Sequence, residues 1–429
     1  MPDQRYDLHS KAYFADPYPV YHAMREHDPV YRQPETGAWM LTRHDDMVEL
    51  CRHPRVSADR TAPLFPAGSD SGTGSDLGTG SDGDIGAATA ADRQNATLRN
   101  FLAPWLIFLD GAEHARVRSV LSRSFTPRAI AGLRPFVRTV VDDAITTLRA
   151  ADSPDLIRDL ALPVPARVIG HLLGLPPEDL PGFQQSVNAV FQFAGQLGDP
   201  EENLRLAHRA TEELGDYFRA LVAEKRRARR GRAADEPPAD LVSIMITADE
   251  DGGLLTEHEL VANCALLLVT GHETTTHTLG NGVIALLRHP EQLRLLRDKP
   301  ELIGSAVEEI LRYDSSSGLI GRLLLDDIEI RGQRIEQGSF VYAVGQAANR
   351  DPAVYPDPDR FDITRTGPRH LGFGHGVHAC IGAALARLET DVALTALLRA
   401  FPDLAPVTDE YDWIASYSQR GVRSLPVAL

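Results

Sequence analysis

One cysteine of the sequence lies in a glycine-containing loop directly before a helical pattern. Cys380 follows Gly374 and Gly376, and residues 383–390 have the composition of a helix. The free N–H groups and positive dipole end of such a helix favour the ionised form of a thiol placed there. Glycines also let a backbone pass close to a flat ligand. A lone cysteine is most often a small buried core residue, but this setting favours a metal held by a single thiolate.

A second polar site lies inside the longest apolar stretch of the chain. Residues 260–288 are predicted to form one long helix, which should be buried because it is apolar on most sides. Its centre, residues 270–275, reads Thr-Gly-His-Glu-Thr-Thr. Hydroxyls there can bond to carbonyls one turn back and open the helix. The alternative to a functional site is a hydroxyl-rich bend without chemistry.

Together the two motifs resemble those of the cytochrome P450 family. Residues 373–382, Phe-Gly-His-Gly-Val-His-Ala-Cys-Ile-Gly, are similar to the family's haem-binding loop, in which the cysteine thiolate is the axial iron ligand. The resemblance implies haem b as the cofactor and Cys380 as the metal ligand. It also implies cofactor contacts from the loop residues Phe373, Gly374, His378 and Gly382.

The central cluster of the long helix resembles the oxygen-activation motif of the same family. The resemblance implies two catalytic residues: Glu273 passes protons inward from solvent, and Thr274 places its hydroxyl beside the bound dioxygen. The family usually has Ala or Gly where this chain has Thr270. That extra hydroxyl could order a water or bind a polar substrate group, and it is a hint of unusual chemistry.

The resemblance also implies partners for the two haem propionates, which need cationic or hydrogen-bonding groups when the haem is buried. These partners are His114, Arg118, Arg322 and His378. For each of them alone, a solvated surface charge is the alternative.

A buried triad is implied as well. Glu309 and Arg312 are three residues apart on one helical face, and Arg360 is expected to complete the family's triad. The three residues should hold their helix to the loop that carries the cysteine.

The implied architecture is mainly α with small β sheets. It is the cytochrome P450 fold, with the haem between the long central helix and the cysteine loop, and we expect one catalytic domain over residues 1–429. Residues 18–27 should form a helix, residues 34–37 a hairpin turn, and helices should dominate from about 112 to 313. Short strands are expected near 327–330, 334–335 and 340–343, and in a final β region toward the C-terminus.

Residues 67–91 differ in composition from the rest of the chain. They are almost entirely Gly, Ser, Asp, Thr and Ala, so they cannot bury enough apolar surface to order themselves and should be flexible. By resemblance this insert falls in the loop that roofs the substrate pocket. Its aspartates lack the regular spacing of a calcium loop. A loose lid would suit a bulky or carrier-tethered substrate.

Composition limits the partners and the compartment. The net charge of −16 argues against nucleic acid binding, and residues 1–10 show neither a charged leader with an apolar run nor a span of about 20 apolar residues, so we expect no membrane anchor. Three cysteines cannot form a disulfide framework, so we expect a cytoplasmic protein. The chain has no flavin or dinucleotide fingerprint. By resemblance, its electrons should come from a ferredoxin and a ferredoxin reductase.

The function implied is that of a bacterial haem-thiolate monooxygenase of secondary metabolism, such as antibiotic biosynthesis. It would insert one oxygen atom from dioxygen into a medium-sized natural product. One alternative keeps the haem but carries out oxidative coupling or cyclisation without oxygen insertion. Another is a catalytically silent haem protein that recruits a partner enzyme. Comparison with the family places the substrate against residues 101–108 and against Leu266, Val269, Thr270, Gly318, Leu319, Ser418 and Gln419.

Overall fold

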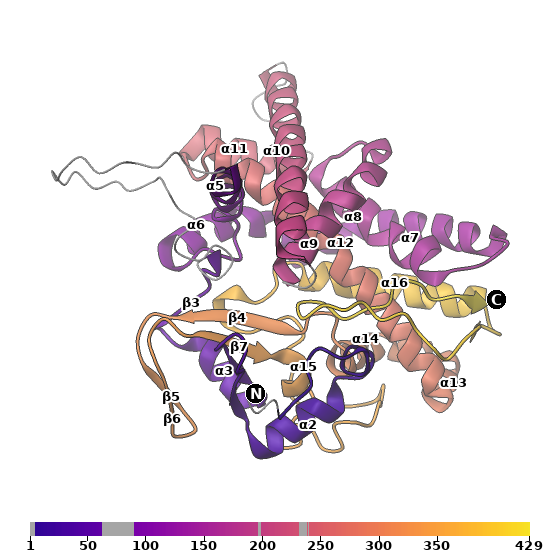
Figure 1. The fold of residues 1–429 in the computed structure, drawn as a ribbon. Coiled ribbons are helices and arrows are strands. Elements are labelled where there is room, and N and C mark those ends of the chain that lie inside the picture. The colour runs from indigo at the N-terminus through magenta and orange to yellow at the C-terminus, as the bar shows by residue number, and fades with distance from the viewer. Residues whose placement is uncertain (1–4, 62–89, 196–198, 231–237, 239) are drawn as a thin grey trace.

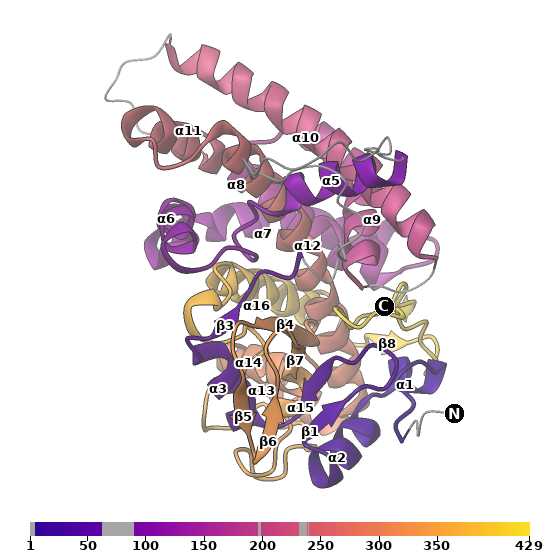
Figure 2. The ribbon, with the colours of Figure 1, turned by 60° about the vertical axis from the view of Figure 1, so that its left-hand side comes forward.

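The computed structural model describes residues 5–61, 90–195, 199–230, 238 and 240–429. The predicted insert at 67–91 lies outside the described residues, except for its last two positions. The long helix α12 (Glu257–Arg288) runs from a helical part of the molecule to a part that contains the small sheets (Figures 1 and 2). The mainly α fold is confirmed.

The helical part contains α5 (Ala90–Leu102), α6 (Gly111–Leu121), α7 (Pro127–Ala150), α8 (Pro163–Leu173), α9 (Gln184–Gly195), α10 (Pro200–Arg230), α11 (Leu241–Gly252) and α16 (Ala383–Ala400). At the end with the sheets lie α1 (Lys11–Ala15), α2 (Tyr18–His27), α3 (His44–Arg52), α13 (Pro290–Asp298), α14 (Ile303–Tyr313) and α15 (Gly345–Ala348). Helix α2 has the predicted bounds. Within the described residues, no helix is both long and apolar enough to cross a membrane.

Helix α12 begins at a capping box. The Thr256 hydroxyl accepts a hydrogen bond from the Glu259 N–H, and the Glu259 carboxylate accepts one from the Thr256 N–H. The predicted back-bonding is present, because the Thr270 hydroxyl donates to the Leu266 carbonyl at 2.8 Å and the Thr274 hydroxyl to the Thr270 carbonyl at 3.1 Å. The helix nevertheless continues unbroken to Arg288. The expectation that these bonds open the helix is therefore wrong.

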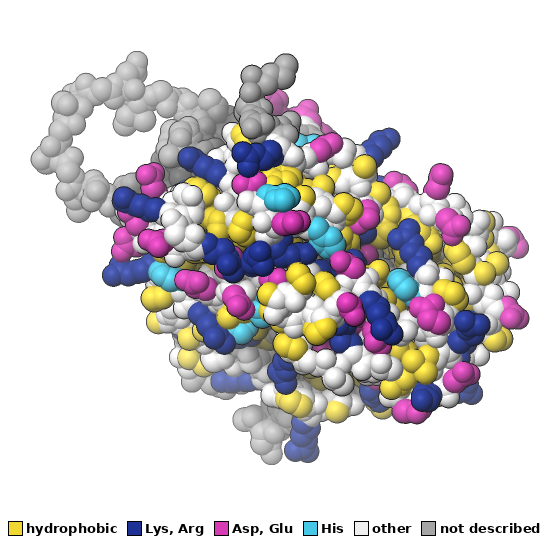
Figure 3. All heavy atoms as spheres, turned by 90° about the horizontal axis from the view of Figure 1, so that it is seen from below, with side chains coloured by type: hydrophobic (Ala, Val, Ile, Leu, Met, Phe, Trp, Pro, Cys, Tyr) yellow, Lys and Arg dark blue, Asp and Glu magenta, His cyan; other side chains and the backbone are white. Residues whose placement is uncertain are grey.

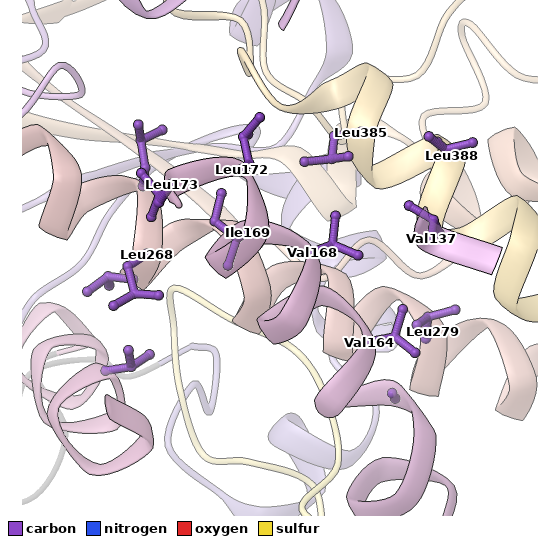
Figure 4. Packing of buried hydrophobic residues seen from close by; sticks show 14 of the residues in the cluster. Val137, Val164, Val168, Ile169, Leu172, Leu173, Leu268, Leu279, Leu385 and Leu388 are labelled. Carbon is purple, nitrogen blue, oxygen red and sulfur yellow. The ribbon is translucent and has the colours of Figure 1, made fainter. Parts of the chain in front are cut away.

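Helix α8 packs closely against α12 in the core (Figure 4). A glycine permits this approach, since a Cβ on Gly271 would lie 2.7 Å from the Cγ1 atom of Ile169. The apolar residues shown there come from α7, α8, α12 and α16, and each stabilises the fold by about 1.5–3 kcal/mol through its burial. They are Val137, Val164, Val168, Ile169, Leu172, Leu173, Leu268, Leu279, Leu385 and Leu388.

A five-stranded sheet in the described part of the chain has the order β1-β2-β7-β4-β3. Its strands are β1 (Val30–Arg32), β2 (Trp39–Leu41), β3 (Val56–Ser57), β4 (Leu319–Leu324) and β7 (Phe340–Val344). Strands β1 and β2 form the predicted hairpin, β2 pairs with β7 in parallel, and β4 is antiparallel to both β7 and β3. Two-stranded pairs are formed by β5 (Ile328–Ile330) with β6 (Gln333–Ile335), and by β8 (Ala405–Pro406) with β9 (Val427–Ala428).

Charge is mixed on the face shown in Figure 3. Lysine and arginine side chains lie among aspartates and glutamates there, with apolar side chains between them. The net negative charge of the chain is therefore not spread as a uniform acidic surface on this face.

The buried triad contains a different arginine from the one expected. Arg312 donates two hydrogen bonds to the Glu309 carboxylate, at 2.7 and 2.8 Å, and the third member is Arg365, whose Nε lies 3.2 Å from Glu309 Oε1. The Arg360 side chain is 65% exposed and lies 3.7 Å from Asp362. Only its backbone carbonyl takes part, as an acceptor for Arg312 and Arg365. The assignment of Arg360 was wrong because the chain turns back after it.

Substituting these two arginines separates their roles. Arg365→Met should lower the free energy of unfolding by on the order of 3 kcal/mol, because it removes one partner from a buried ion-pair cluster. Arg360→Met should change it by about 0.5 kcal/mol or less, as expected for an exposed side chain. Denaturant unfolding followed by circular dichroism measures both values, and equal losses would contradict this account.

A carboxyl group in α16 generates a second prediction. Glu389 is 0% exposed, and neither of its carboxyl oxygens has a hydrogen-bond partner in the described structure. Burial raises the pKa of this carboxyl well above its ordinary value. Above that ordinary value the unfolded chain releases a proton that the folded protein keeps, so stability falls as pH rises.

Glu389→Gln should therefore flatten the decline of stability between pH 6 and pH 9. The wild type should lose up to about 1.4 kcal/mol more per pH unit than the variant. Denaturant midpoints measured across this range give the two slopes. Parallel slopes would show that Glu389 is ionised in the folded protein.

Candidate functional site

A cavity of about 310 Å³ lies between α12 and the loop that precedes α16. It brings together three segments that are distant in the sequence: the centre of α12, the cysteine loop and the first strand residues of β4. Its lining includes Leu266, Thr270, Gly271, Thr274, Gly318, Leu319, Arg322, Phe373, Gly374, His378, Cys380 and Gly382. The two predicted motifs therefore face one another across a common space.

Backbone contacts hold the cysteine loop in shape. The Cys380 N–H donates to the Phe373 carbonyl at 2.9 Å. Gly374 and Gly376 have φ angles of 71° and 74°, a left-handed conformation that side chains rarely adopt. A Cβ on Gly376 would lie 2.8 Å from the carbonyl oxygen of Cys51. These two glycines are therefore needed for the conformation of the loop itself. We had expected them only to let the backbone pass close to a flat ligand.

Cys380 lines the cavity, and its side chain is accessible from that space. Burial raises the pKa of this thiol, while the N–H groups of Gly382 and Ala383 and the guanidinium groups of Arg118 and Arg387 act in the opposite direction without reversing the shift. The helix start therefore contributes as predicted, but it does not by itself hold the thiol ionised. A metal cation bound to the sulfur would complete the stabilisation of the thiolate.

The four predicted propionate partners meet at one edge of the cavity. Arg118, Arg322 and His378 line it, and the His114 ring lies against the His378 ring with a centroid distance of 4.2 Å. Burial, followed by the neighbouring His114 and Arg322, lowers the pKa of His378 to about 4. Burial and Arg118 also lower the pKa of His114. Both imidazoles are therefore neutral at pH 7.

This edge of the cavity fits two carboxylates. The Arg118 guanidinium donates to the Ala379 carbonyl at 2.6 Å, and Arg322 donates to the Gly321 carbonyl at 2.8 Å, which leaves further N–H groups on each. The Nε2 atom of His114 is buried and has no hydrogen-bond partner among the described residues. Two cations and an unused imidazole nitrogen match the propionates of haem b.

The predicted acid and the predicted hydroxyl face different sides of α12. Thr274 lines the cavity, whereas Glu273 does not. The Glu273 carboxylate lies between two imidazoles, with Oε1 at 3.5 Å from Nε2 of His277 and Oε2 at 3.7 Å from Nε2 of His272. Burial raises the pKa of Glu273, but His277, His272 and Gln184 outweigh it, so the pKa lies below its ordinary value.

Sequence reasoning missed His277, although its spacing gave a signal. It lies four residues after Glu273 and therefore on the same helical face. The C-terminal segment holds this imidazole from the other side, since a Cβ on Gly421 would lie 2.1 Å from Nδ1 of His277. The helical spacing was therefore enough to predict that His277 lies beside Glu273. It was not enough to predict the contact between His277 and Gly421.

A second cavity of about 610 Å³ adjoins the first. Of the predicted substrate contacts, Val269 and Ser418 line the second cavity, and Leu266 and Gly318 line the first. Thr270 and Leu319 line both. Gln419 lines neither cavity: it is buried, and its backbone pairs with Ser317. The segment 101–108 contributes Leu102, Trp105, Leu106, Ile107 and Phe108 to the two cavities.

Known proteins resemble most of this chain. The family model for cytochrome P450 matches residues 85–412. Cytochrome P450 monooxygenase PikC of Streptomyces venezuelae is 36% identical over 422 residues, which cover 96% of this chain and 91% of PikC.

Two solved structures resemble this one closely. The crystal structure of P450BioI in complex with an acyl carrier protein ligated to hexadec-9Z-enoic acid has a TM-score of 0.84 at 29% identity, covering 98% of this chain and 100% of that one. The structure of CxnD, described as a cytochrome P450 enzyme for C–S bond formation in chuangxinmycin biosynthesis, has a TM-score of 0.82 at 35% identity, covering 98% and 97%.

The contact between Glu273 and His277 can be tested through pH. An acid with a lowered folded-state pKa stabilises the protein above its ordinary pKa, and this stabilisation is lost as pH falls through the lowered value. A double-mutant cycle with Glu273→Gln and His277→Phe should therefore give a coupling free energy of about 0.5–3 kcal/mol at pH 7. The coupling should decrease when unfolding is measured at progressively lower pH. No coupling at pH 7 would refute the contact.

Proposed function

This chain belongs to the cytochrome P450 family, and we propose that it is a monooxygenase that inserts one oxygen atom from dioxygen into a medium-sized natural product. The observation that carries this proposal is the shared cavity. It is lined by the single thiol of the cysteine loop, Cys380, and by the hydroxyl of Thr274 on α12. Two segments more than a hundred residues apart thus place a metal ligand and a proton donor around one reaction space.

Different residues around the cavity would bind different parts of the cofactor. Haem b, when bound, supplies the iron at which dioxygen is activated. Cys380 would be the ligand to that iron, with its sulfur as the thiolate. Arg118 and Arg322 would neutralise the two propionates, while His114 and His378 would offer neutral N–H donors.

Proton movement is assigned to the two sides of α12. Thr274 lines the cavity, and its hydroxyl donates a hydrogen bond to the Thr270 carbonyl. Rotation of the hydroxyl would let it donate instead to a ligand in the cavity. Glu273 is ionised, 14% exposed and in contact with Gln184 of α9, so it can take up a proton from solvent behind the helix. Thr274 is therefore the last protein group in the route and Glu273 is its outer end.

The second cavity supports the substrate class. Its lining is mostly aliphatic and aromatic, as expected for a largely apolar molecule. The P450BioI structure, which contains a carrier protein, makes a carrier-tethered substrate a specific form of this proposal. We assign electron supply to a ferredoxin and its reductase, because the sequence has no flavin or dinucleotide fingerprint. A cytoplasmic location is part of the same proposal.

A second candidate function is oxidative coupling or cyclisation without oxygen insertion. Thr270 favours it, because its hydroxyl lines both cavities where the family usually has a small residue. The 35% identity to CxnD, described as an enzyme for C–S bond formation, points the same way. The catalytically silent role is disfavoured, since Glu273 and Thr274 are both retained and Thr274 lines the cavity.

The test uses the purified haem protein with redox partners and isotope-labelled dioxygen. A substrate is first identified by the spin-state change that it causes in the ferric spectrum. Label in the product would establish oxygen insertion, whereas an unlabelled coupled or cyclised product would establish the second candidate. Cys380→Ala should lose the absorption band that thiolate ligation gives to the reduced carbon monoxide complex. A wild-type protein without that band would overturn both functions.

Thr274→Ala should lower product formation by about 100-fold, because it removes a positioned proton donor. The consumption of reduced nicotinamide should continue, so the yield of product per electron pair should fall. Thr276→Ala is the matched control: the Thr276 hydroxyl bonds to the His272 carbonyl at 2.9 Å and does not line the cavity. An unchanged yield in Thr274→Ala would remove the role assigned to this hydroxyl.

A further inference from the structure

Arg60 lies where the two cavities meet. Its side chain lines both of them, together with Ile107, Thr270 and Leu319. The Nε atom of Arg60 is enclosed by protein and has no hydrogen-bond partner, and within the described residues no group accepts a hydrogen bond from this guanidinium. The cation therefore faces the space in which a substrate would lie.

Packing alone holds the Arg60 side chain in place. Its stem crosses Gly321 of β4, where a Cβ would lie 2.9 Å from the Cδ atom of Arg60. Its guanidinium carbon lies 5.0 Å from the centroid of the Phe108 ring. An added side chain at position 321 would also strike Phe340 at 2.7 Å. The arginine is thus positioned in advance by a glycine and an aromatic ring.

Among the described residues, no carboxylate pairs with this charge, and the attraction of Asp59 does not offset the burial of the guanidinium. Neither cavity is lined by an Asp or Glu among the described residues. The neighbouring Asp59 uses its Oδ1 to accept hydrogen bonds from the N–H and hydroxyl of Thr61. Burial, with added repulsion from Arg322, lowers the pKa of Arg60 to about 10. A buried cation without a partner is unfavourable, so the site is built to receive an anion.

The cavity has one more guanidinium group than haem b has propionates. Three guanidinium groups line the haem cavity, namely those of Arg60, Arg118 and Arg322. The two propionates of haem b neutralise Arg118 and Arg322. The third guanidinium keeps its charge when the cofactor is bound.

We propose that Arg60 recognises a carboxylate of the substrate, so that this enzyme acts on acidic molecules with a largely apolar body. The inference rests on the proposed monooxygenase function and specifies its substrate class. A guanidinium binds a carboxylate through two parallel hydrogen bonds, which fixes the orientation of the molecule as well as its affinity. The apolar body would lie in the larger cavity, against side chains that include Leu102, Trp105, Phe108, Val190, Phe191 and Val269.

The experiment compares acids with their neutral methyl esters on the ferric holoenzyme. Three pairs differ in shape: dodecanoic acid, 4-phenylbutanoic acid and lithocholic acid, each with its ester. Binding is measured by the spin-state change of the haem or by competition with a ligand that gives one. In at least one pair the acid should bind the wild type about 10-fold to 100-fold more tightly than the ester.

Variants assign that preference to Arg60. Arg60→Met should make the acid and the ester bind equally, mainly by weakening the acid, and Arg60→Lys should keep part of the preference because it keeps the charge. Arg55→Met is the control: this arginine is exposed, pairs with Asp326 at 3.5 Å and lines neither cavity. It should leave the preference unchanged.

Several outcomes would overturn the inference. Equal binding of acid and ester by the wild type in every pair would do so, as would a preference that persists in Arg60→Met. Loss of haem from Arg60→Met would instead identify Arg60 as a propionate partner. A wild type with the thiolate band but no preference for acids refutes only this inference, whereas a wild type without the band refutes the proposed function.

Discussion

The ion pair between Glu309 and Arg312 is the interaction on which the geometry of the site depends. Besides holding Glu309, Arg312 donates to the Asn349 carbonyl at 3.0 Å, and the Asn349 side chain accepts a hydrogen bond from the Leu371 N–H at 2.6 Å. Leu371 is the residue whose carbonyl begins the turn of the cysteine loop. A buried charge pair in α14 is thereby connected through backbone groups to the position of the Cys380 sulfur. Because each step uses a buried polar group, each is costly to break.

In the described part of the chain, no carboxylate lines either of the two cavities, and this shortage determines the electrostatics of the interior. Arginines supply positive charge there, and burial lowers the pKa values of His114 and His378 beside them. Haem b would complete this arrangement, since it would bring two carboxylates for Arg118 and Arg322 and a metal cation for the thiol. Of the three guanidinium groups that line the first cavity, Arg60 would then remain charged beside an apolar space. Under our proposals, cofactor binding and substrate selection therefore depend on the same set of arginines.

Local patterns in the sequence identified the elements and the cavity-facing motifs. Helix α2, the hairpin and the long helix follow from periodicity and turn residues, and the cysteine loop follows from its glycines. The errors concern contacts made over long distances. Arg365 replaces Arg360 because the chain reverses between them, and no local pattern encodes that reversal. The prediction for Glu273, an acid that passes protons inward from solvent, did not require it to line the cavity, and it lies on another face of the helix from Thr274 because a helix turns by about 100° per residue.

Position 421 shows how far the chemistry of α12 extends through the molecule. It lies near the C-terminus and lines neither cavity, yet its backbone packs against the imidazole of His277, which in turn holds Glu273 ionised. Any side chain at this position would push that imidazole away. A directed-evolution library restricted to cavity residues would omit position 421, although one methyl group there would displace the imidazole beside Glu273 without entering either cavity.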